Sequence, residues 1–209
     1  MKVINLCLLV VAAASFLLTT ANANAVGDFE DFEAYTDAEI EQMIADELGE
    51  GEFMGVDQLG LYKILLAGYK GVNGTLCLID EVADIMLSCT GYVTDLATCT
   101  GNIPTDVKAV LKHITNAIDI GSEITHFKTE LCASKTRGIV SGAEKAAKCA
   151  VKLSVKTLSM IRQVSDAIKL TGLFPTKTGN CYVSSTKSVV GDCKAFVPNL
   201  KSCVTHMTS

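Results

Sequence analysis

The sequence predicts an all-α fold, in which disulfides stabilise a bundle of helices. Apolar residues recur at spacings of three and four along most of the chain, and no stretch sustains the alternation of a strand. Cysteines also recur at a fixed spacing, with steps of 12 and then 10 residues used twice at an offset of 104. The two triplets are Cys77, Cys89, Cys99 and Cys181, Cys193, Cys203. The sequence therefore predicts two pseudo-repeats of about 104 residues that arose by duplication.

Residues 1–25 are expected to be a signal peptide rather than part of the fold. A basic residue precedes an apolar run over 4–18, and Ala23 and Ala25 fit a small-residue cleavage site before Val26. The apolar run is shorter than the ~20 residues that a membrane span requires. We therefore expect cleavage, a secreted extracellular protein, and no transmembrane span in the mature chain.

Removal of the signal peptide takes away Cys7 and leaves eight cysteines. An even number of cysteines in an exported chain indicates disulfides, because the export route is oxidising. No Cys-x-x-Cys is present and the three histidines are scattered, so no metal and no cofactor is expected. All eight are expected to be bonded, in pairs that the sequence does not fix: Cys77, Cys89, Cys99, Cys132, Cys149, Cys181, Cys193 and Cys203.

The segment 26–57 differs in charge from everything that follows it. It holds twelve acidic residues and no lysine or arginine, whereas residues 58–209 hold 17 basic and 11 acidic residues. Thr36 and Glu39 form a capping-box pattern before a short amphipathic helix, which Gly49 and Gly51 would end. The segment is expected to be a solvated tail; a pro-segment, or an acidic arm folded over the basic body, is the alternative.

Residues 58–209 are expected to form a cysteine-rich helical domain. Helical spacing predicts a first helix up to Gly68–Gly71, a second between Cys77 and Cys89, and a long third helix from Pro104 to Leu131. A loop is expected over 133–142. A capping box at Ser141 and Glu144 then opens a helix that ends near Gly172.

The pseudo-repeats would occupy about 58–132 and 141–209. One symmetric scheme for the disulfides bonds Cys77 to Cys99 and Cys181 to Cys203. In a straight helix the first pair would lie ~33 Å apart, whereas a disulfide needs Cα atoms within ~7 Å. The scheme therefore requires a chain reversal at Thr90–Gly91, and Pro198 suggests a break in the second copy as well.

No residue set in the sequence assigns a reaction. A Gly-x-Ser-x-Gly nucleophile elbow and a phosphate-binding glycine loop are both absent. His113 and His126 lie roughly 20 Å apart on one predicted helix, so they cannot share a site. Glu123 and Glu130 flank His126 at helical spacing, and this arrangement is more typical of a surface ion pair than of an acid–base dyad. We expect no catalytic residue, and hence no enzyme.

Two features could serve binding. Lys145, Lys148, Lys152 and Lys156 form a basic stripe on one helix face, which could meet an acidic partner or simply be solvated. Asn73-Gly74-Thr75 is an N-glycosylation sequon in what is expected to be a glycine-rich turn.

The function expected from the sequence is that of a secreted, non-enzymatic protein that acts by binding or as a structural component. The sequence does not identify its partner, which could be a protein or an apolar small molecule. No nucleic-acid partner is expected, and the absence of tryptophan argues weakly against single-stranded nucleic acid. The first alternative is an extracellular carrier of an apolar small molecule in a cavity between helices. A toxin or antimicrobial effector with an acidic pro-segment is the second alternative.

Overall fold

Six helices contain most of the residues that the structure, a computed structural model, describes: 36–48, 58–99, 101–133, 142–174 and 179–205. No strand occurs among these residues, and three disulfides join the helices. The prediction of an all-α, disulfide-stabilised fold is therefore confirmed. Three predicted features lie outside the described residues: the signal peptide, the glycine stop at 49–51 and most of the 133–142 loop. The domain boundaries remain predictions.

The first described helix, α2 (Asp37–Leu48), begins at the predicted capping box. The Thr36 backbone N–H donates to Glu39 Oε2 at 2.8 Å, and the Glu39 N–H donates to Thr36 Oγ1 at 3.3 Å. These hydrogen bonds lower the pKa of the Glu39 carboxyl. Ile44 is only 6% exposed and belongs to the hydrophobic core, and α2 packs against the helix that begins at Gly142.

Helix α3 (Gln58–Lys70) ends close to the predicted place, but α4 (Val72–Thr98) is longer than the sequence suggested. α4 begins five residues before Cys77 and runs without interruption through Thr90 and Gly91. The expected chain reversal at Thr90–Gly91 is therefore wrong. A glycine within a helix costs only about 1 kcal/mol, and the packing of α4 along its whole length outweighs that cost.

Helix α5 (Thr105–Thr125) follows Pro104 as expected, but it ends six residues before the predicted end at Leu131. His126 caps the helix, because its N–H donates to the Ser122 carbonyl at 3.0 Å. The chain then turns, and the Cys132 N–H donates to the Phe127 carbonyl at 2.7 Å. This turn brings Cys132 to its disulfide partner on the next helix.

The last two helices are α6 (Gly142–Thr171) and α7 (Asn180–Thr205). α6 matches the predicted helix, although Ser141 of its capping box lies outside the described residues. α7 continues through Pro198, so the expected break there is wrong. Pro198 is exposed, so its ring lies at the surface of the helix and the packed face of α7 remains intact. That packing offsets the ~3 kcal/mol cost of a proline inside a helix.

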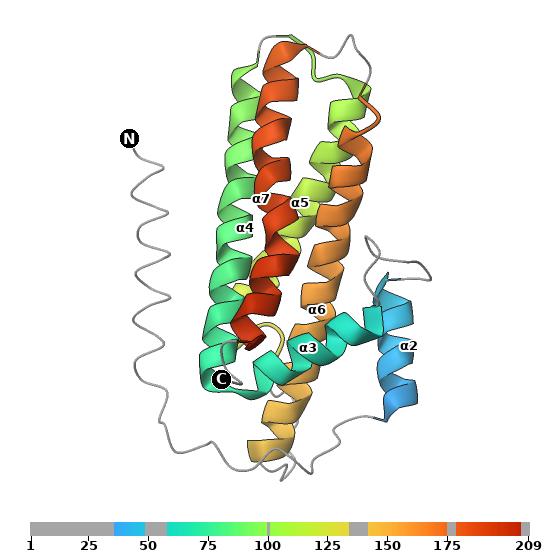
Figure 1. Cartoon of the computed structure of the whole chain (residues 1–209), viewed down its shortest axis with the longest axis vertical. Coiled ribbons are helices and arrows are strands. Elements are labelled where there is room, and N and C mark those ends of the chain that lie inside the picture. The colour runs from blue at the N-terminus through green and yellow to red at the C-terminus, as the bar shows by residue number, and fades with distance from the viewer. Residues whose placement is uncertain (1–35, 49–57, 100, 134–141, 175–178, 206–209) are drawn as a thin grey trace. The chain divides into compact units, whose positions relative to one another are not determined.

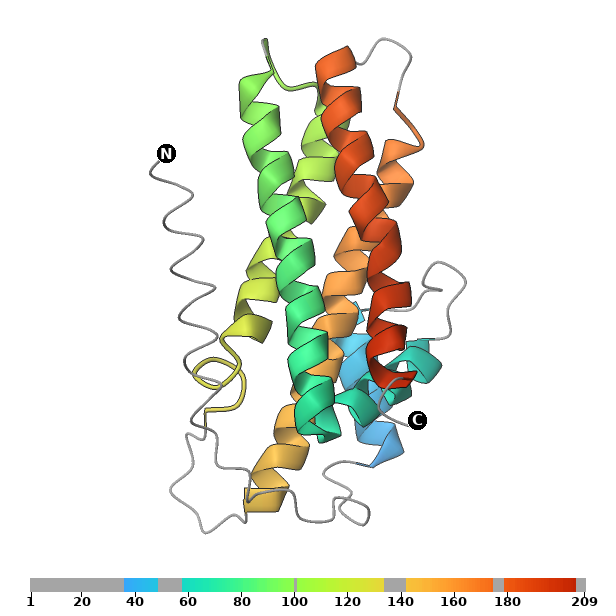
Figure 2. The ribbon, with the colours of Figure 1, turned by 60° about the vertical axis from the view of Figure 1, so that its left-hand side comes forward.

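The four long helices lie side by side, each antiparallel to the next along the chain (Figures 1 and 2). α4 packs against α5, α5 against α6, and α6 against α7, while α7 closes the bundle by packing along α4. α3 lies across one end, in contact with α4, α6 and α7. α6 is the most enclosed helix, because α2, α3, α5 and α7 all contact it.

The core is built from aliphatic side chains, as the composition predicts. Leu65, Leu78, Ile114 and Leu158 are each 0% exposed. One pair of buried polar groups bonds across helices: the Tyr69 hydroxyl and Thr157 Oγ1 form a hydrogen bond of 2.8 Å between α3 and α6. That pairing satisfies two groups that would otherwise be buried without a partner.

Two helical glycines are expected to respond in opposite ways to alanine. At Gly91 an added Cβ meets nothing within 4 Å, so Gly91→Ala should raise the free energy of unfolding by about 0.5–1 kcal/mol through helix propensity. At Gly121 an added Cβ would meet Met86 Sδ at 2.6 Å and Met160 Cε at 3.1 Å. Gly121→Ala should therefore lower the free energy of unfolding by about 1–3 kcal/mol. Urea unfolding of both variants tests the pair, and a gain at Gly121 would contradict the α4–α5–α6 packing.

Candidate functional site

Six of the eight cysteines form three disulfides, and their pairing differs from the symmetric scheme. The bonds are Cys77–Cys203, Cys99–Cys181 and Cys132–Cys149, with Cα–Cα distances of 5.7, 5.8 and 5.1 Å. The scheme that bonds Cys77 to Cys99 and Cys181 to Cys203 is wrong, because α4 and α7 are continuous helices that keep those pairs apart. Cys89 and Cys193, which we expected to be bonded, are buried thiols.

The two interhelical bridges join opposite ends of the same pair of helices. Cys77–Cys203 links the start of α4 to the end of α7, and Cys99–Cys181 links the end of α4 to the start of α7. The helices must therefore run antiparallel, and the two bridged cysteines of each segment lie 22 positions apart in the sequence. We call the exposed surface of these two helices the α4–α7 face.

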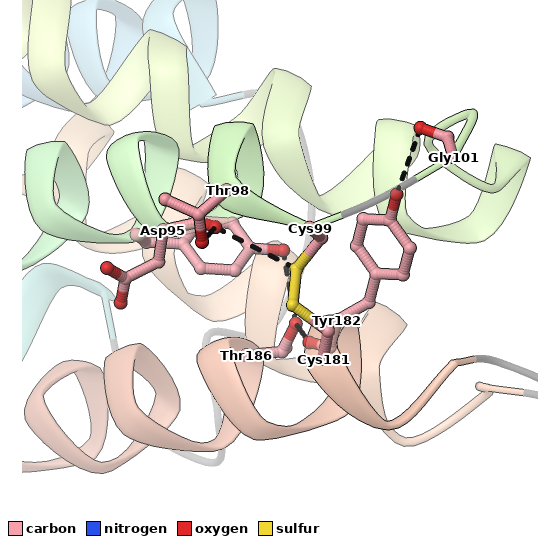
Figure 3. Close-up of a disulfide and its surroundings, with 8 residues drawn as sticks. Asp95, Thr98, Cys99, Gly101, Cys181, Tyr182 and Thr186 are labelled. Atoms are coloured by element: carbon pink, nitrogen blue, oxygen red, sulfur yellow. Dashed lines mark hydrogen bonds between the residues drawn. A yellow bond between two sulfur atoms is a disulfide. The ribbon is translucent and has the colours of Figure 1, made fainter.

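Polar contacts reinforce the bridge between Cys99 and Cys181 (Figure 3). Tyr182, the residue after Cys181, donates from its hydroxyl to the Gly101 carbonyl at 3.4 Å. Gly101 has a φ of +100°, a conformation that favours glycine, and it lets the chain leave α4 toward α5. One turn further along α7, Thr186 Oγ1 and the Tyr92 hydroxyl form a buried hydrogen bond of 3.1 Å.

A groove lies between α4 and α7 toward the Cys77–Cys203 end. It encloses about 150 Å³, and the side chains that line it are Glu81, Asp84, Ile85, Ser88, Asp192, Ala195, Phe196 and Asn199. Ile85 and Phe196 are buried, at 4% and 2% exposed, whereas Asp84, Asp192 and Asn199 are exposed. Across the groove, Asn199 Nδ2 donates to Glu81 Oε2 at 2.9 Å. The groove therefore combines two buried apolar side chains with three carboxylates.

The carboxylates of α4 stand close together in a helix that has no basic residue. Asp80, Glu81 and Asp84 fall within two turns, and no lysine or arginine occurs between Lys70 and Lys108. Asp80 is exposed, but the neighbouring protein partly desolvates its carboxyl and so raises its pKa, and the negative charge of Asp84, one turn away, raises it further. At neutral pH this side chain therefore opposes folding.

Asp80→Asn is expected to stabilise the protein at pH 7, and the gain should shrink as the pH falls. The folded-state pKa of Asp80 lies above its ordinary value, so the folded protein takes up the proton first on acidification. Below the ordinary carboxyl pKa both states are protonated and the penalty is gone. Urea unfolding between pH 7 and pH 3 measures the effect, and Asp119→Asn, an exposed site on α5, controls for net charge. A gain that is the same at every pH would contradict this assignment.

Three of the four lysines in the predicted stripe contact groups within the chain. Lys148 pairs with Glu144 at 2.5 Å, Lys156 pairs with Glu123 at 3.2 Å, and Lys152 donates to a backbone carbonyl at 3.1 Å. That carbonyl belongs to Leu131, so Lys152 helps to hold the turn before Cys132. Lys145 is exposed. Binding of a partner by this stripe remains a prediction.

The glycosylation sequon lies in the first turn of α4 rather than in a separate glycine-rich turn. Asn73 is exposed, Gly74 is buried, and Thr75 Oγ1 donates to the Tyr69 carbonyl at 3.2 Å. The side chain of Asn73 is thus at the surface, whereas the Thr75 hydroxyl is engaged with the backbone. Modification of Asn73 remains a prediction.

The histidines contact groups other than one another. His113 Nδ1 and Gln163 Oε1 form a hydrogen bond of 2.8 Å between α5 and α6. His126 Nδ1 lies 2.9 Å from the Ser122 carbonyl, while Glu123, its expected ion-pair partner, binds Lys156 instead. His206 lies outside the described residues. Both described histidines therefore have structural contacts.

Two further observations concern ligands and membranes. Within the part of the chain that the structure describes, no group of three histidine, cysteine or acidic side chains is placed to hold a metal ion. None of the helices in that part is long and apolar enough to cross a bilayer. Comparison with protein-family models, curated proteins and solved structures finds no match to this chain.

Sequence reasoning did not identify the groove, because its residues come from two segments about 110 positions apart. Glu81 and Asn199 carry no local signal of contact. Only the antiparallel pairing of α4 with α7 brings them together. The repeated cysteine spacing was the one feature of the sequence that carried information about the pairing of α4 with α7.

Proposed function

We propose that this protein is exported and acts outside the cell as a non-enzymatic binding protein. The observation that carries the proposal is the bridging of α4 and α7 at both ends by Cys77–Cys203 and Cys99–Cys181. Bonds of this kind persist in oxidising compartments. They fix the relative position of the two helices and hence the shape of the α4–α7 face, and a preformed surface loses less entropy when it binds a partner.

The α4–α7 face is the contact surface that we propose for a protein partner. It presents Leu87, which is 49% exposed, and the groove with its acidic rim. Exposed apolar side chains beside fixed polar groups are common at protein interfaces. The groove supports a carrier function less well, because sites for small molecules usually enclose about 300–1,000 Å³ and are mostly apolar.

Export is tested by expressing the full chain with a C-terminal tag in a eukaryotic secretory cell. We expect the protein in the medium, with a mature N-terminus at Val26 and with Cys77–Cys203 and Cys99–Cys181 intact. Retention in the cytosol with reduced cysteines would contradict the proposal.

Binding is tested by cross-linking the secreted protein in extracellular fluid of the source organism, followed by mass spectrometry. We expect cross-links to one partner from Lys187 and Lys194, which are exposed on α7. Leu87→Arg should abolish them, whereas Leu173→Arg, at a leucine 75% exposed after α6, should not. An equal loss of cross-links in both variants would contradict the proposal that the α4–α7 face binds the partner. Cross-links from α5 alone would contradict it too.

A further inference from the structure

Cys89 on α4 and Cys193 on α7 are the two cysteines outside the three bridges. They are 0% and 3% exposed, and both belong to the core between the two helices. The Cys89 thiol raises the pKa of the Cys193 thiol more than burial does, so the two side chains are close neighbours. Two buried thiols are therefore in contact in the middle of a helix pair that already has a disulfide at each end.

The packed faces of the two helices place these thiols in one layer of the core. The buried residues of α4 step by four and three, as do those of α7, and this is the pattern of helices packed side by side over a long distance. From Leu78 onward the buried positions of α4 are 78, 82, 85, 89, 92 and 96, and those of α7 are 182, 186, 189, 193, 196 and 200. Every position of the second set lies 104 residues after its counterpart in the first.

The bridged cysteines are related by the same offset of 104 residues, but each one bonds to the counterpart of the other outer cysteine. Cys181 is the counterpart of Cys77 and Cys203 that of Cys99, yet Cys77 bonds to Cys203 and Cys99 bonds to Cys181. Such a reciprocal exchange is what two copies of one element give when they meet around a two-fold axis. The midpoint between the bridges falls at residue 88 of α4 and 192 of α7, next to Cys89 and Cys193. Near such an axis a residue faces its own counterpart, and Cys193 is the counterpart of Cys89.

The distance between α4 and α7 is also suitable for a disulfide between Cys89 and Cys193. A disulfide needs a Cα–Cα distance of about 4.4–6.8 Å. The flanking bridges hold α4 and α7 at 5.7 and 5.8 Å, one on each side of the thiol pair. The two helices thus approach each other to disulfide distance at both ends of the segment that contains Cys89 and Cys193.

We propose that Cys89 and Cys193 form a fourth disulfide in the oxidised protein, in the centre of the α4–α7 contact. The oxidant is a low-molecular-weight disulfide such as oxidised glutathione. One cysteine thiolate attacks it, forming a mixed disulfide and releasing one glutathione thiolate. The second cysteine, as its thiolate, then attacks the protein sulfur of the mixed disulfide and releases the other glutathione. The two cysteines lose two protons and two electrons, and the oxidant is reduced to two glutathione molecules.

The bond forms before α4 and α7 close on each other. Its first step needs a thiolate, but contact with Cys89 and burial raise the pKa of the Cys193 thiol in the folded protein. Burial also keeps the oxidant out. A pair that escapes oxidation during folding therefore stays reduced, and the folded protein should react far more slowly than the unfolded chain.

The test is a disulfide map of two preparations: protein secreted into the medium, and protein refolded from the reduced, unfolded state with glutathione disulfide. Free thiols are alkylated in denaturant before digestion. Trypsin alone is insufficient, because no basic residue between Lys70 and Lys108 separates Cys77, Cys89 and Cys99. Cleavage before aspartates as well gives peptide 84–94 for Cys89 and peptide 192–194 for Cys193.

We expect peptides 84–94 and 192–194 to be joined, with neither carrying the alkyl group, in at least one preparation. Reduction before alkylation should separate them and label both. If both peptides are alkylated in both preparations, or if either is joined to another cysteine peptide, the proposal is wrong. The refolded sample needs no export, so failure of secretion would count against the proposed function without affecting this result.

Discussion

Replacing Cys77 and Cys203 together by alanine should lower the free energy of unfolding by about 4 kcal/mol. The bridge spans 126 residues of sequence, but the intact Cys99–Cys181 bond shortens the loop that it closes. When Cys89 and Cys193 are reduced, the path runs along 22 residues of each helix, and closing a loop of that size restricts the unfolded chain by about this amount. A Cys89–Cys193 bond would shorten the path to 12 and 10 residues, and the expected loss would then be about 3.4 kcal/mol. For a domain of this length the melting temperature should fall by roughly 8–16 °C.

Cys132→Ala/Cys149→Ala is the matched control. Its bond closes a loop of only 17 residues, so the expected loss is smaller, about 3 kcal/mol. Under reducing conditions the Cys77→Ala/Cys203→Ala variant and the wild type should unfold at nearly the same urea concentration. A loss below 1 kcal/mol in the oxidised variant would mean that the ends of α4 and α7 stay together in the unfolded chain without the bond.

Phe196→Ala should have a comparable effect through packing instead of chain entropy. The ring is 2% exposed, lies in the α4–α7 contact and lines the groove. Truncating a buried phenylalanine removes apolar contacts and leaves a cavity, which usually costs about 3–5 kcal/mol. Because all disulfides remain, the unfolded states of variant and wild type are the same, and urea midpoints can be compared directly.

Leu87→Ala is the control for Phe196→Ala, since Leu87 lies on the same face but is 49% exposed. It should change the free energy of unfolding by no more than about 0.5 kcal/mol. A small effect at Phe196, of 1 kcal/mol or less, would mean that its ring contributes little to the α4–α7 contact.

Local sequence patterns predicted the starts of helices correctly where interactions within one helical turn determine them. The capping box at Thr36 and Glu39 placed the start of α2, and Pro104 placed the start of α5. Both are interactions within one turn, so they can be read from spacing alone. The same local reasoning failed at Gly91 and Pro198, where long-range packing outweighs the cost of a helix-breaking residue.

The disulfide pairing could not be predicted because cysteine spacing does not reveal the direction of the helices. The outer cysteines of each triplet are 22 residues apart, and this number is the same whether the second helix runs parallel or antiparallel to the first. The ~33 Å span of a straight helix excludes Cys77–Cys99 only if the helix between them is continuous, and the sequence suggested a reversal there. That constraint could have ruled out the symmetric scheme if α4 had been recognised as continuous.

The order of the bridges along the chain has a further consequence. Cys77–Cys203 encloses Cys99–Cys181, which in turn encloses Cys132–Cys149, so every bridge spans the segment between Cys132 and Cys149. A backbone cut in that segment would give two chains in which each bridge is intermolecular. Such a cleaved protein would migrate as one species on a non-reducing gel and as two fragments after reduction. Proteolytic processing at this point could therefore leave the molecule covalently whole.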